Sequence, residues 1–344
     1  MHLRGYHAYH KIIKKGDIFF VRFIFWKVFS YYKDLQVGLI NKKELNMGAQ
    51  LWMSPVTGYR RKGTRFDSLH AIFVDKITLT LIFEPILCCK ENDEASNARY
   101  ALEKRDFDIT AVVNDQGIVI GQVRKDALMD GFVKQFMEKI DESCLISEDV
   151  PIVDLLTLLE NDPYKYVTSK GHITGIVTRA DLNKPLPRTY LFGIVSLVEM
   201  HMTYWISAYF PDDSWTEKLK ENRLKQARDV HAQRQSSNDA ISLLECIQLC
   251  DKKTILMSND DFLSTFSFES KKRFKIFMEA IERIRNEIAH NQNSIIAGMK
   301  WDTFVDTFHL AKDFLETSDK IIEADCEEKA REHAQDILVS VSVK

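Results

Sequence analysis

The chain of 344 residues lacks the cysteine patterns that mark zinc sites and disulfide frameworks. Its 6 cysteines include no Cys-x-x-Cys pair, which argues against a zinc ribbon or a thioredoxin-like site. Cys246 and Cys250 share a helix face, but no histidine or acidic residue completes a ligand set at finger-like spacing. We therefore expect buried, reduced thiols and no metal site. Because no clear signal peptide is present, we also expect a cytoplasmic protein.

A strong charge of one sign is also missing. The 47 basic and 50 acidic residues give a net charge of −3, so the total charge does not indicate a nucleic-acid binder. Uninterrupted apolar runs are rare as well: residues 18–32 contain Arg22 and Lys27, and residues 191–210 contain Glu199. The first run is too short to span a bilayer, and the second is better explained as a helix buried in a bundle. We expect no stable membrane association.

The N-terminal segment has no clear periodicity. Residues 1–46 are rich in lysine, arginine and aromatic residues, whereas a more regular sequence begins at Met47. One interpretation places the native start at Met47 and treats the preceding residues as an extension of doubtful structure. The alternative is an amphipathic arm that lies on a membrane or on a partner. Residues 47–76 then form a lead-in to the next segment.

An internal repeat decides the fold class. Residues 109–128 and 164–182 each contain a β-rich run, a turn with glycine, a second β-rich run and a helix start. A helical stretch precedes each copy, at residues 95–104 and 152–160. Strands that alternate with helices at a period of roughly 54 residues predict two consecutive α/β modules.

Each copy ends on a related segment. Residues 175–182 read Gly-Ile-Val-Thr-Arg-Ala-Asp-Leu, and residues 121–128 are a degenerate version of this pattern. The pattern resembles the signature that closes a CBS module, so about a third of the chain is similar to a tandem CBS pair. The resemblance implies a degenerate module 1 at residues 77–135 and a module 2 at residues 136–186.

The same resemblance implies clefts that bind adenosine-bearing ligands such as AMP or ATP. In that family, the aspartate of a Thr-x-x-Asp pattern takes the ribose hydroxyls and the threonine contacts phosphate, which here implies Asp181 and Thr178. A carboxylate accepts two vicinal hydroxyl donors, and a hydroxyl at a helix start adds to N–H groups that favour anions. Tyr166, on the preceding strand, is a candidate for packing against the base.

Module 1 departs from this pattern. Arg124 stands at the position of Thr178, and Ala127 stands at the position of Asp181. Module 1 therefore lacks the carboxylate that would hold a ribose, although Arg124 and Lys125 are suited to phosphate. We expect one competent nucleotide cleft. In the alternative interpretation, Thr178 only caps the following helix and Asp181 only supports its first turn.

The sequence after Leu182 indicates helices only. Pro185 and Pro187 predict a short, stiff connector, because proline restricts its own backbone and that of its predecessor. Amphipathic segments with short breaks then predict an antiparallel all-α bundle over residues 187–322, followed by a tail at residues 323–344 without assigned function. The expected helices are 188–210, 215–234, 240–257, 269–290 and 301–322.

A short motif lies at the end of the fourth expected helix. Residues 285–290 read Arg-Asn-Glu-Ile-Ala-His, which resembles the Arg-x4-6-His motif of HEPN domains, helical bundles that often act as metal-independent endoribonucleases. The resemblance implies Arg285, Asn286 and His290 as active-site residues. RNA cleavage without metal needs a base for the 2′-hydroxyl and a cation for the charge at phosphorus, and histidine and arginine are suitable.

Helical spacing adds an expectation about assembly. Asn286 and His290 share a face opposite the apolar stripe, with Arg285 on its flank, provided that the helix extends to His290. A site that points away from its own core is exposed to solvent unless another surface covers it, so we expect two copies to meet there about a two-fold axis and form a composite cleft. In the alternative, Arg285 only pairs with Glu282, and His290 only terminates the helix.

Three charged residues elsewhere in the expected bundle are of interest. Glu199 is a carboxylate within an apolar helix, and we expect it to pair with Arg285 or another base, or to orient the site. The alternative is an ordinary, partly exposed glutamate. Lys252 and Lys253 are suited to phosphate, although a solvated pair of lysines is the simpler interpretation.

Together these patterns predict a homodimer in which a CBS pair senses AMP or ATP and regulates a HEPN-like endoribonuclease that acts on RNA without a catalytic cofactor. Such regulation requires the ligand to bind two arrangements of the dimer unequally. The alternative function is a non-catalytic, nucleotide-gated dimerisation or interaction protein.

Overall fold

The structure is a computed structural model that describes residues 52, 54, 59–237, 241–266, 268–290, 294–296 and 298–342. Beyond residue 331 it describes the backbone only. The chain divides into two units, Met1–Asn46 and Met47–Lys344, and all described residues belong to the second. The interpretations of residues 1–46 and of a start at Met47 lie outside the described residues.

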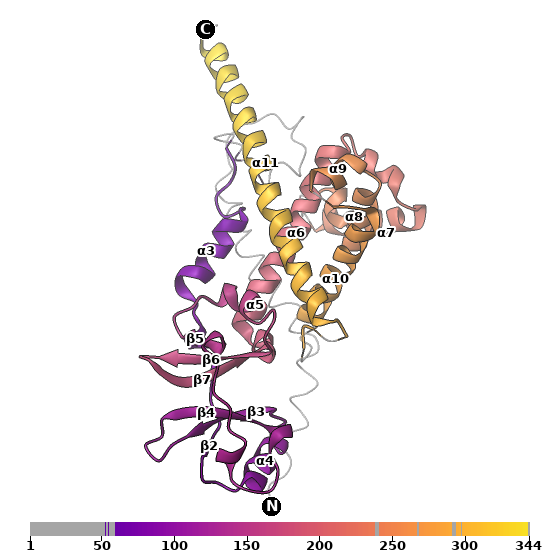
Figure 1. The fold of residues 1–344 in the computed structure, drawn as a ribbon. Helices are drawn as coiled ribbons and strands as arrows, with labels where there is room; N and C mark the ends of the chain where they lie inside the picture. The colour runs from indigo at the N-terminus through magenta and orange to yellow at the C-terminus, as the bar shows by residue number, and fades with distance from the viewer. Residues whose placement is uncertain are drawn as a thin grey trace, which may run out of the picture. The chain divides into compact units, whose positions relative to one another are not determined.

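Modules 1 and 2 repeat the same succession of elements (Figure 1). In module 1 the elements are β2 (Cys88–Lys90), α4 (Ala95–Glu103), β3 (Ile109–Val113), β4 (Val119–Arg124) and the 3-10 turn η3 (Lys125–Ala127). In module 2 they are β5 (Leu145–Ser147), η6 (Ile152–Asp154), α5 (Leu155–Leu158), β6 (Tyr164–Ser169), β7 (His172–Thr178) and η7 (Arg179–Asn183). The first strand of each copy is parallel to the second, and the second is antiparallel to the third. The predicted order of strands and helices is confirmed in both copies.

The hairpins of the two copies follow from local turn chemistry. Gly117 (φ 77°) lies in the β3–β4 turn, and Lys170 (φ 51°) and Gly171 (φ 81°) form the β6–β7 turn. Positive φ at both central residues is the geometry that matches the twist of a two-residue hairpin. Each hairpin also has a register irregularity at the same place, after Val112 in module 1 and after Val167 in module 2.

The two modules exchange short edge segments. β1 (Glu84–Pro85) belongs to module 1 by sequence but pairs antiparallel with β7 of module 2, and Glu138 of module 2 pairs with Gln122 of module 1. A glycine makes room for each crossing: a Cβ on Gly175 would lie 2.7 Å from the carbonyl oxygen of Glu84, and a Cβ on Gly121 would lie 2.7 Å from that of Glu138. The glycine that opens each signature is therefore required by packing.

Helices occupy most of the remaining chain. They are α6 (Pro185–Tyr209), α7 (Glu221–Ser236), α8 (Leu249–Met257), α9 (Asp260–Thr265), α10 (Lys271–Ala289) and α11 (Trp301–Ser342). α6, α8 and α10 pack on one another, and α11 packs on α6 and α10. The C-terminal part is thus helical as predicted, but several boundaries differ. The third expected helix, 240–257, is α8 preceded by the separate 3-10 turn η9 (Leu243–Cys246), and α9 was not expected.

The first correction concerns the connector. Pro185 and Pro187 form the first turn of α6, where a proline needs no N–H partner and its backbone already suits a helix. The second concerns the tail, because α11 continues without a break from residue 322 to Ser342, and its inner face remains buried at Cys326 and Ala330. The third concerns the second expected helix: residues 215–218 belong to a separate 3-10 turn that ends before α7.

α6 is long and apolar. Among the described residues it is the helix whose length and composition would allow it to cross a membrane, and 50% of its most apolar window is buried within the structure. Its buried side chains contact the other helices and α3 (Phe66–Lys76).

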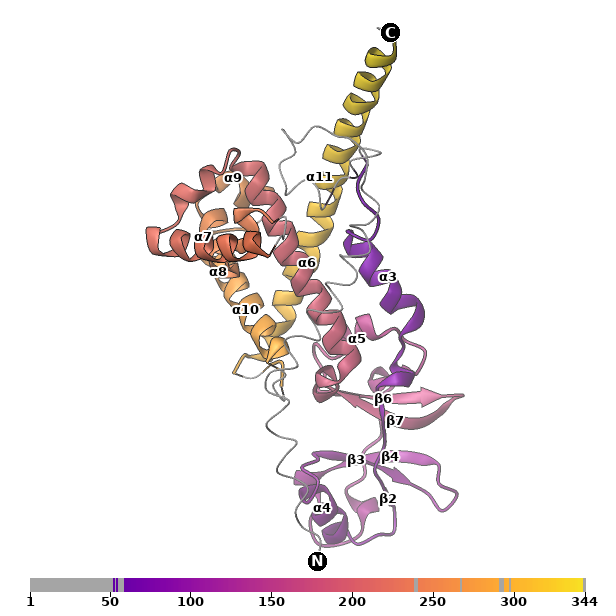
Figure 2. The ribbon, with the colours of Figure 1, turned by 180° about the vertical axis from the view of Figure 1, so that it is seen from behind.

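The lead-in segment packs on the helices (Figure 2). α3 contacts α6 and α11, and Gly193 of α6 permits the close approach, since a Cβ there would lie 2.8 Å from a methyl group of Leu69. The Nδ1 atom of His70 and the hydroxyl of Tyr190 are 2.9 Å apart, which adds a hydrogen bond between α3 and α6. The two modules therefore lie in sequence between two segments, α3 and α6, that pack on each other.

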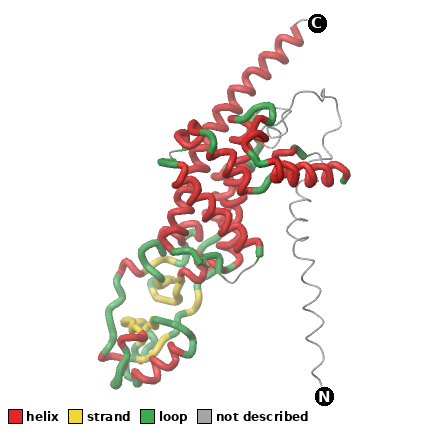
Figure 3. Tube along the Cα trace, turned by 90° about the vertical axis from the view of Figure 1, so that its right-hand side faces the viewer, coloured by secondary structure: helices red, strands yellow, loops and turns green. Residues whose placement is uncertain are grey.

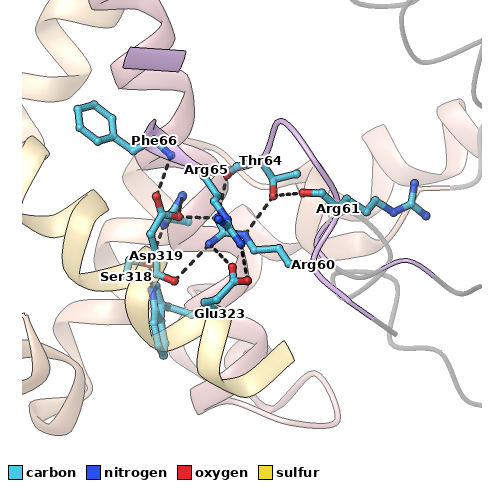
Figure 4. Close-up of polar contacts among 10 residues, drawn as sticks. Arg60, Arg61, Thr64, Arg65, Phe66, Ser318, Asp319 and Glu323 are labelled. Atoms are coloured by element: carbon cyan, nitrogen blue, oxygen red, sulfur yellow. Dashed lines mark hydrogen bonds and ion pairs between the residues drawn. The ribbon is translucent and has the colours of Figure 1, made fainter. Parts of the chain in front are cut away.

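A buried polar network attaches the residues before α3 to α11 (Figure 4). The Arg60 side chain is 2% exposed and pairs with the Asp319 carboxylate, which also accepts a 2.7 Å hydrogen bond from the Phe66 backbone N–H. Arg65 pairs with Glu323 one turn later. A buried arginine is retained at low cost only when its donors are satisfied, as they are here by Thr64 and Asp319.

Three apolar cores hold these elements, and Figure 3 shows the strands gathered in the modules and most of the helices outside them. The largest core includes Val167, Val177 and Leu182 of module 2 together with the helices. Module 1 has a core of its own, and a third cluster lies between the two sheets. Module 2 is therefore continuous with the helical part, whereas module 1 joins that core only through its first residues, such as Leu79 and Ile82, among the described residues.

Candidate functional site

The signature of module 2 forms a reciprocal cap at the start of η7. The Asp181 carboxylate accepts hydrogen bonds from the Thr178 backbone N–H (2.6 Å) and the Thr178 hydroxyl (3.1 Å). The Thr178 hydroxyl accepts in turn from the backbone N–H of Ala180 (3.2 Å). The structure thus brings the two predicted ligand-binding residues together, in the arrangement that the helix-capping interpretation describes.

The second oxygen of Asp181 is also occupied. It lies 2.8 Å from the ammonium group of Lys184, which also contacts Glu84 and the carbonyl oxygen of Ile82. Burial alone would lower the pKa of Lys184, but the hydrogen bonds with Asp181 and Glu84 raise it above its ordinary value. Because the Asp181 side chain is only 7% exposed, a ribose could reach it only by displacing these partners.

Tyr166 lies in the cluster between the two sheets. Its side chain is fully buried, and its ring packs edge-on against Tyr164 at 5.5 Å. Its hydroxyl has no hydrogen-bond partner in the described part of the chain, and burial raises the pKa of this phenol. The structure therefore offers a nucleotide base no exposed surface of this ring.

The corresponding segment of module 1 is open to solvent. The Arg124 side chain is 52% exposed and lies 3.7 Å from the Glu138 carboxylate. Lys125 pairs with Asp108 at 2.8 Å. These basic side chains remain accessible to an anionic ligand, although each already has an acidic neighbour.

Module 2 joins the helices through Arg179, the residue that follows Thr178. Its guanidinium lies 4.2 Å from the centre of the Trp301 ring and donates to the carbonyl oxygens of Leu159 and Glu160. The Trp301 indole N–H donates to the same Glu160 oxygen at 2.9 Å. The start of α11 is thereby bound to the signature of module 2.

Two further contacts reach the end of α10. The Asn183 side-chain oxygen accepts a 2.8 Å hydrogen bond from the backbone N–H of Ile295, in the loop after α10. Arg188, in the first turns of α6, donates to the carbonyl oxygen of Glu287 at 3.1 Å. The sequence pattern gave no indication of these contacts, because the partners lie far apart along the chain.

The residues of the predicted nuclease motif lie at the C-terminal end of α10. The helix ends at Ala289, and His290 is its C-cap, with its backbone N–H bonded to the Asn286 carbonyl oxygen at 2.9 Å. Asn286 and His290 are exposed, and neither side chain has a polar partner in the described part of the chain. The helix ends one residue earlier than predicted, so the argument from helical spacing does not extend to His290, although Asn286 and His290 are both exposed.

Arg285 contacts Glu199, one of the partners considered from the sequence, and Glu199 is partly exposed, as the alternative interpretation had it. The Arg285 Nε atom lies 3.7 Å from one Glu199 oxygen, and the Lys252 ammonium lies 3.1 Å from the other. The Lys252 side chain is 6% exposed, so the interpretation of a solvated lysine is wrong for this residue. No ion pair joins Arg285 to Glu282 among the described residues, which removes that alternative as well.

Two surface depressions lie on α11, away from the predicted site residues. One is lined by acidic side chains of module 2 and α11 together with His309, and the other lies between α10 and α11. The depression next to module 2 is unsuited to phosphate because its lining is acidic. Within the described ranges, no group of three histidine, cysteine or acidic side chains is placed to hold a metal ion. The expectation of buried thiols is correct for Cys326 and wrong for the other cysteines, since Cys88 is exposed and the remaining four are half-buried.

No family model matches the chain, and no curated protein matches it. Solved structures resemble about a third of it. An uncharacterized conserved protein from Pyrococcus horikoshii is 20% identical, covers 31% of this chain and 89% of its own, and has a TM-score of 0.28. The CBS domains of a transcriptional regulator from Streptococcus pneumoniae are 18% identical, cover 31% and 98%, and have a TM-score of 0.28. CBSX2 in complex with AMP is 16% identical, covers 33% and 97%, and has a TM-score of 0.29.

Proposed function

We propose that this chain is a cytoplasmic, ligand-responsive regulatory protein in which the CBS-type pair controls the C-terminal end of α10. The observation that carries the proposal is the direct connection between the module 2 signature and the helices. Arg179 binds to Trp301, and Asn183 binds to the loop that follows α10. A change in the signature would therefore act on the helices through existing contacts.

An adenine nucleotide such as AMP or ATP is the proposed ligand. To take the ribose hydroxyls, Asp181 would exchange its hydrogen bonds with Thr178 and Lys184 for bonds with the ligand. Releasing these bonds would loosen the cap of η7, which lies directly before α6. Binding and a shift of α6 would thus be coupled, as ligand control requires.

Hydrogen exchange tests this coupling without assuming any activity. On addition of AMP or ATP, we expect altered exchange in η7, in residues 294–301 and at the end of α10, with little change in α7. Arg124→Ala serves as the control variant, because it alters the equivalent position of module 1. If exchange changed in module 1 alone, the proposed route through module 2 would be wrong.

The proposed output is RNA cleavage without metal. His290 is exposed and able to act as a base, and the half-exposed Arg285 is a permanent cation in the same last turns of α10. Asn286 and His290, which have no polar side-chain partner among the described residues, form an open polar face. In a homodimer a second copy would cover this face and make a composite cleft. RNA is the substrate in this proposal.

A cleavage assay on total RNA in EDTA tests this output, with and without AMP or ATP. We expect Arg285→Ala and His290→Ala to abolish cleavage. Arg283→Ala and His309→Ala are matched controls, since both residues are exposed and Arg283 is on the same helix. If the wild type and all variants were equally inert, the non-catalytic alternative, a nucleotide-gated dimerisation or interaction protein, would take precedence.

A further inference from the structure

Three helices place their charged side chains around Glu199. Glu199 lies on α6, Lys252 on α8 and Arg285 on α10, and these helices pack on one another. One carboxylate therefore has two cationic neighbours. Lys252 is the buried neighbour, and Arg285 is the exposed one, with 43% of its side chain accessible.

The geometry of the Arg285 contact leaves part of the guanidinium available. Glu199 makes its closest approach to Nε, at 3.7 Å, which is an ion pair rather than a hydrogen bond. No hydrogen bond in the described part of the chain involves the terminal Nη groups of Arg285. These groups form the planar, two-pronged edge that matches a phosphate.

The Lys252 contact gives Glu199 a counter-charge that does not depend on Arg285. The Glu199 side chain is 26% exposed, and a partly buried carboxylate that lost its last cationic partner would be disfavoured. The 3.1 Å contact with Lys252 is made by the other Glu199 oxygen and does not involve Arg285. Glu199 can therefore orient the Arg285 guanidinium without depending on Arg285 as its only cationic partner.

We propose that Glu199 is a positioning residue for Arg285: it holds the Nε side of the guanidinium and directs the Nη groups toward a phosphodiester, while Lys252 anchors Glu199. This inference rests on the endoribonuclease proposed above. It adds a regulatory connection, because Glu199 lies on α6, the helix that begins directly after the module 2 signature.

The contact is tested first by NMR of the Arg285 side chain, which requires no activity. We expect the Nε–H resonance of Arg285, identified by its loss in Arg285→Lys, to shift and exchange faster with water in Glu199→Gln. Glu279→Gln is the matched control, because Glu279 also pairs with lysines of the bundle, at 3.7 and 3.8 Å, and does not contact Arg285. An unchanged resonance in Glu199→Gln would overturn the proposal.

Glu199→Gln leaves the buried Lys252 without a charged partner, so a second variant protects the test against misfolding. Glu199→Gln/Lys252→Met removes both charges of this pair, and we expect the Arg285 resonance to change as in the single variant. A resonance like that of the wild type in this double variant would also contradict the proposal.

The functional consequence is measured by binding and by rate. With a 2′-O-methyl RNA oligonucleotide, which resists cleavage, we expect Glu199→Gln to weaken binding, and with cleavable RNA to lower kcat by about tenfold to a hundredfold, the range that misplaced groups produce. The shape of the pH–rate profile should be the same in the variant and in the wild type. Faster cleavage by Glu199→Gln would show an inhibitory contact and overturn the proposal. If wild-type protein cleaved no RNA, the nuclease would be refuted, whereas the NMR result would still decide the contact.

Discussion

The two modules share one topology but differ in how they are attached. Leu128 and Leu182 occupy the same position of the repeat, and both are buried. Leu128 belongs to the separate core of module 1, whereas Leu182 belongs to the core that module 2 shares with the helices. The module that retains the Thr-x-x-Asp pattern is thus the one joined to the helices.

This difference has a consequence for regulation. Module 1 contacts module 2 through the cluster between the sheets and the exchanged edge segments, and only its first residues, such as Leu79 and Ile82, are found in the core shared with the helices among the described residues. Module 2 contacts the helices directly through Arg179 and Asn183. We infer that module 2 transmits the signal and that module 1 supports it.

Matched core deletions should give the largest difference. Leu182→Ala and Leu128→Ala each remove a buried side chain, with an expected cost of about 2–5 kcal/mol. Leu182→Ala should lower the global free energy of unfolding, whereas Leu128→Ala should mainly increase local opening in module 1. Denaturant unfolding and hydrogen exchange measure the two effects. If both variants lost the same protection from hydrogen exchange in α8 and α10, the conclusion that module 1 has a separate core would be wrong.

Mild acid should destabilise the shared core through a buried histidine, a group that module 1 lacks. His201 is fully buried, and burial together with the nearby Arg60 lowers its pKa from 6.5 to about 3. Its contribution to stability is therefore complete above pH 6.5 and is lost as the pH falls toward 3, by about 1.4 kcal/mol per pH unit at most.

The measurement is the free energy of unfolding as a function of pH in the wild type and in His201→Gln. Glutamine keeps a hydrogen-bonding group near Ser318 but does not titrate. The variant should show a shallower decrease below pH 6.5. Identical pH profiles would show that His201 does not carry the effect.

Substitutions in the signatures of the two modules should differ in their effect on nucleotide affinity. Asp181→Asn should weaken AMP or ATP binding by about tenfold or more, equivalent to about 1.4 kcal/mol, because the amide cannot accept two ribose hydroxyls as a carboxylate does. Arg124→Ala, at the equivalent of Thr178, should change the affinity much less. Calorimetric titration measures both affinities. A larger effect of Arg124→Ala would place the ligand in module 1.

The smallest effect concerns the junction. Trp301→Phe keeps an aromatic ring beside Arg179 but removes the N–H that donates to Glu160, with an expected cost of about 0.5–1.5 kcal/mol. We expect nearly unchanged nucleotide affinity and a weaker nucleotide-induced change of hydrogen exchange in α10. If nucleotide changed the hydrogen exchange of α10 in this variant as much as in the wild type, the Trp301 hydrogen bond would not be needed to couple module 2 to α10.

Much of the fold could be predicted from the sequence because its determinants are local. Strand alternation, the left-handed turn at Gly171 and the helical periodicity of α10 each depend on residues close together in the chain. The repeat itself predicted the matching topology of the modules. The pairing of Glu199 with Arg285 was also one of the arrangements considered, since a carboxylate on an apolar helix needs a cationic partner.

Only the tertiary structure decided which parts act together. The attachment of Arg60 to Asp319, the packing of Arg179 on Trp301 and the burial of Lys252 join residues that are distant in sequence, so no local pattern reports them. The Thr-x-x-Asp pattern also did not predict that Thr178 and Lys184 bind the Asp181 carboxylate, because the same pair of residues serves equally well as a helix cap. Local periodicity specifies the elements, whereas burial of apolar surface and pairing of charges select their neighbours.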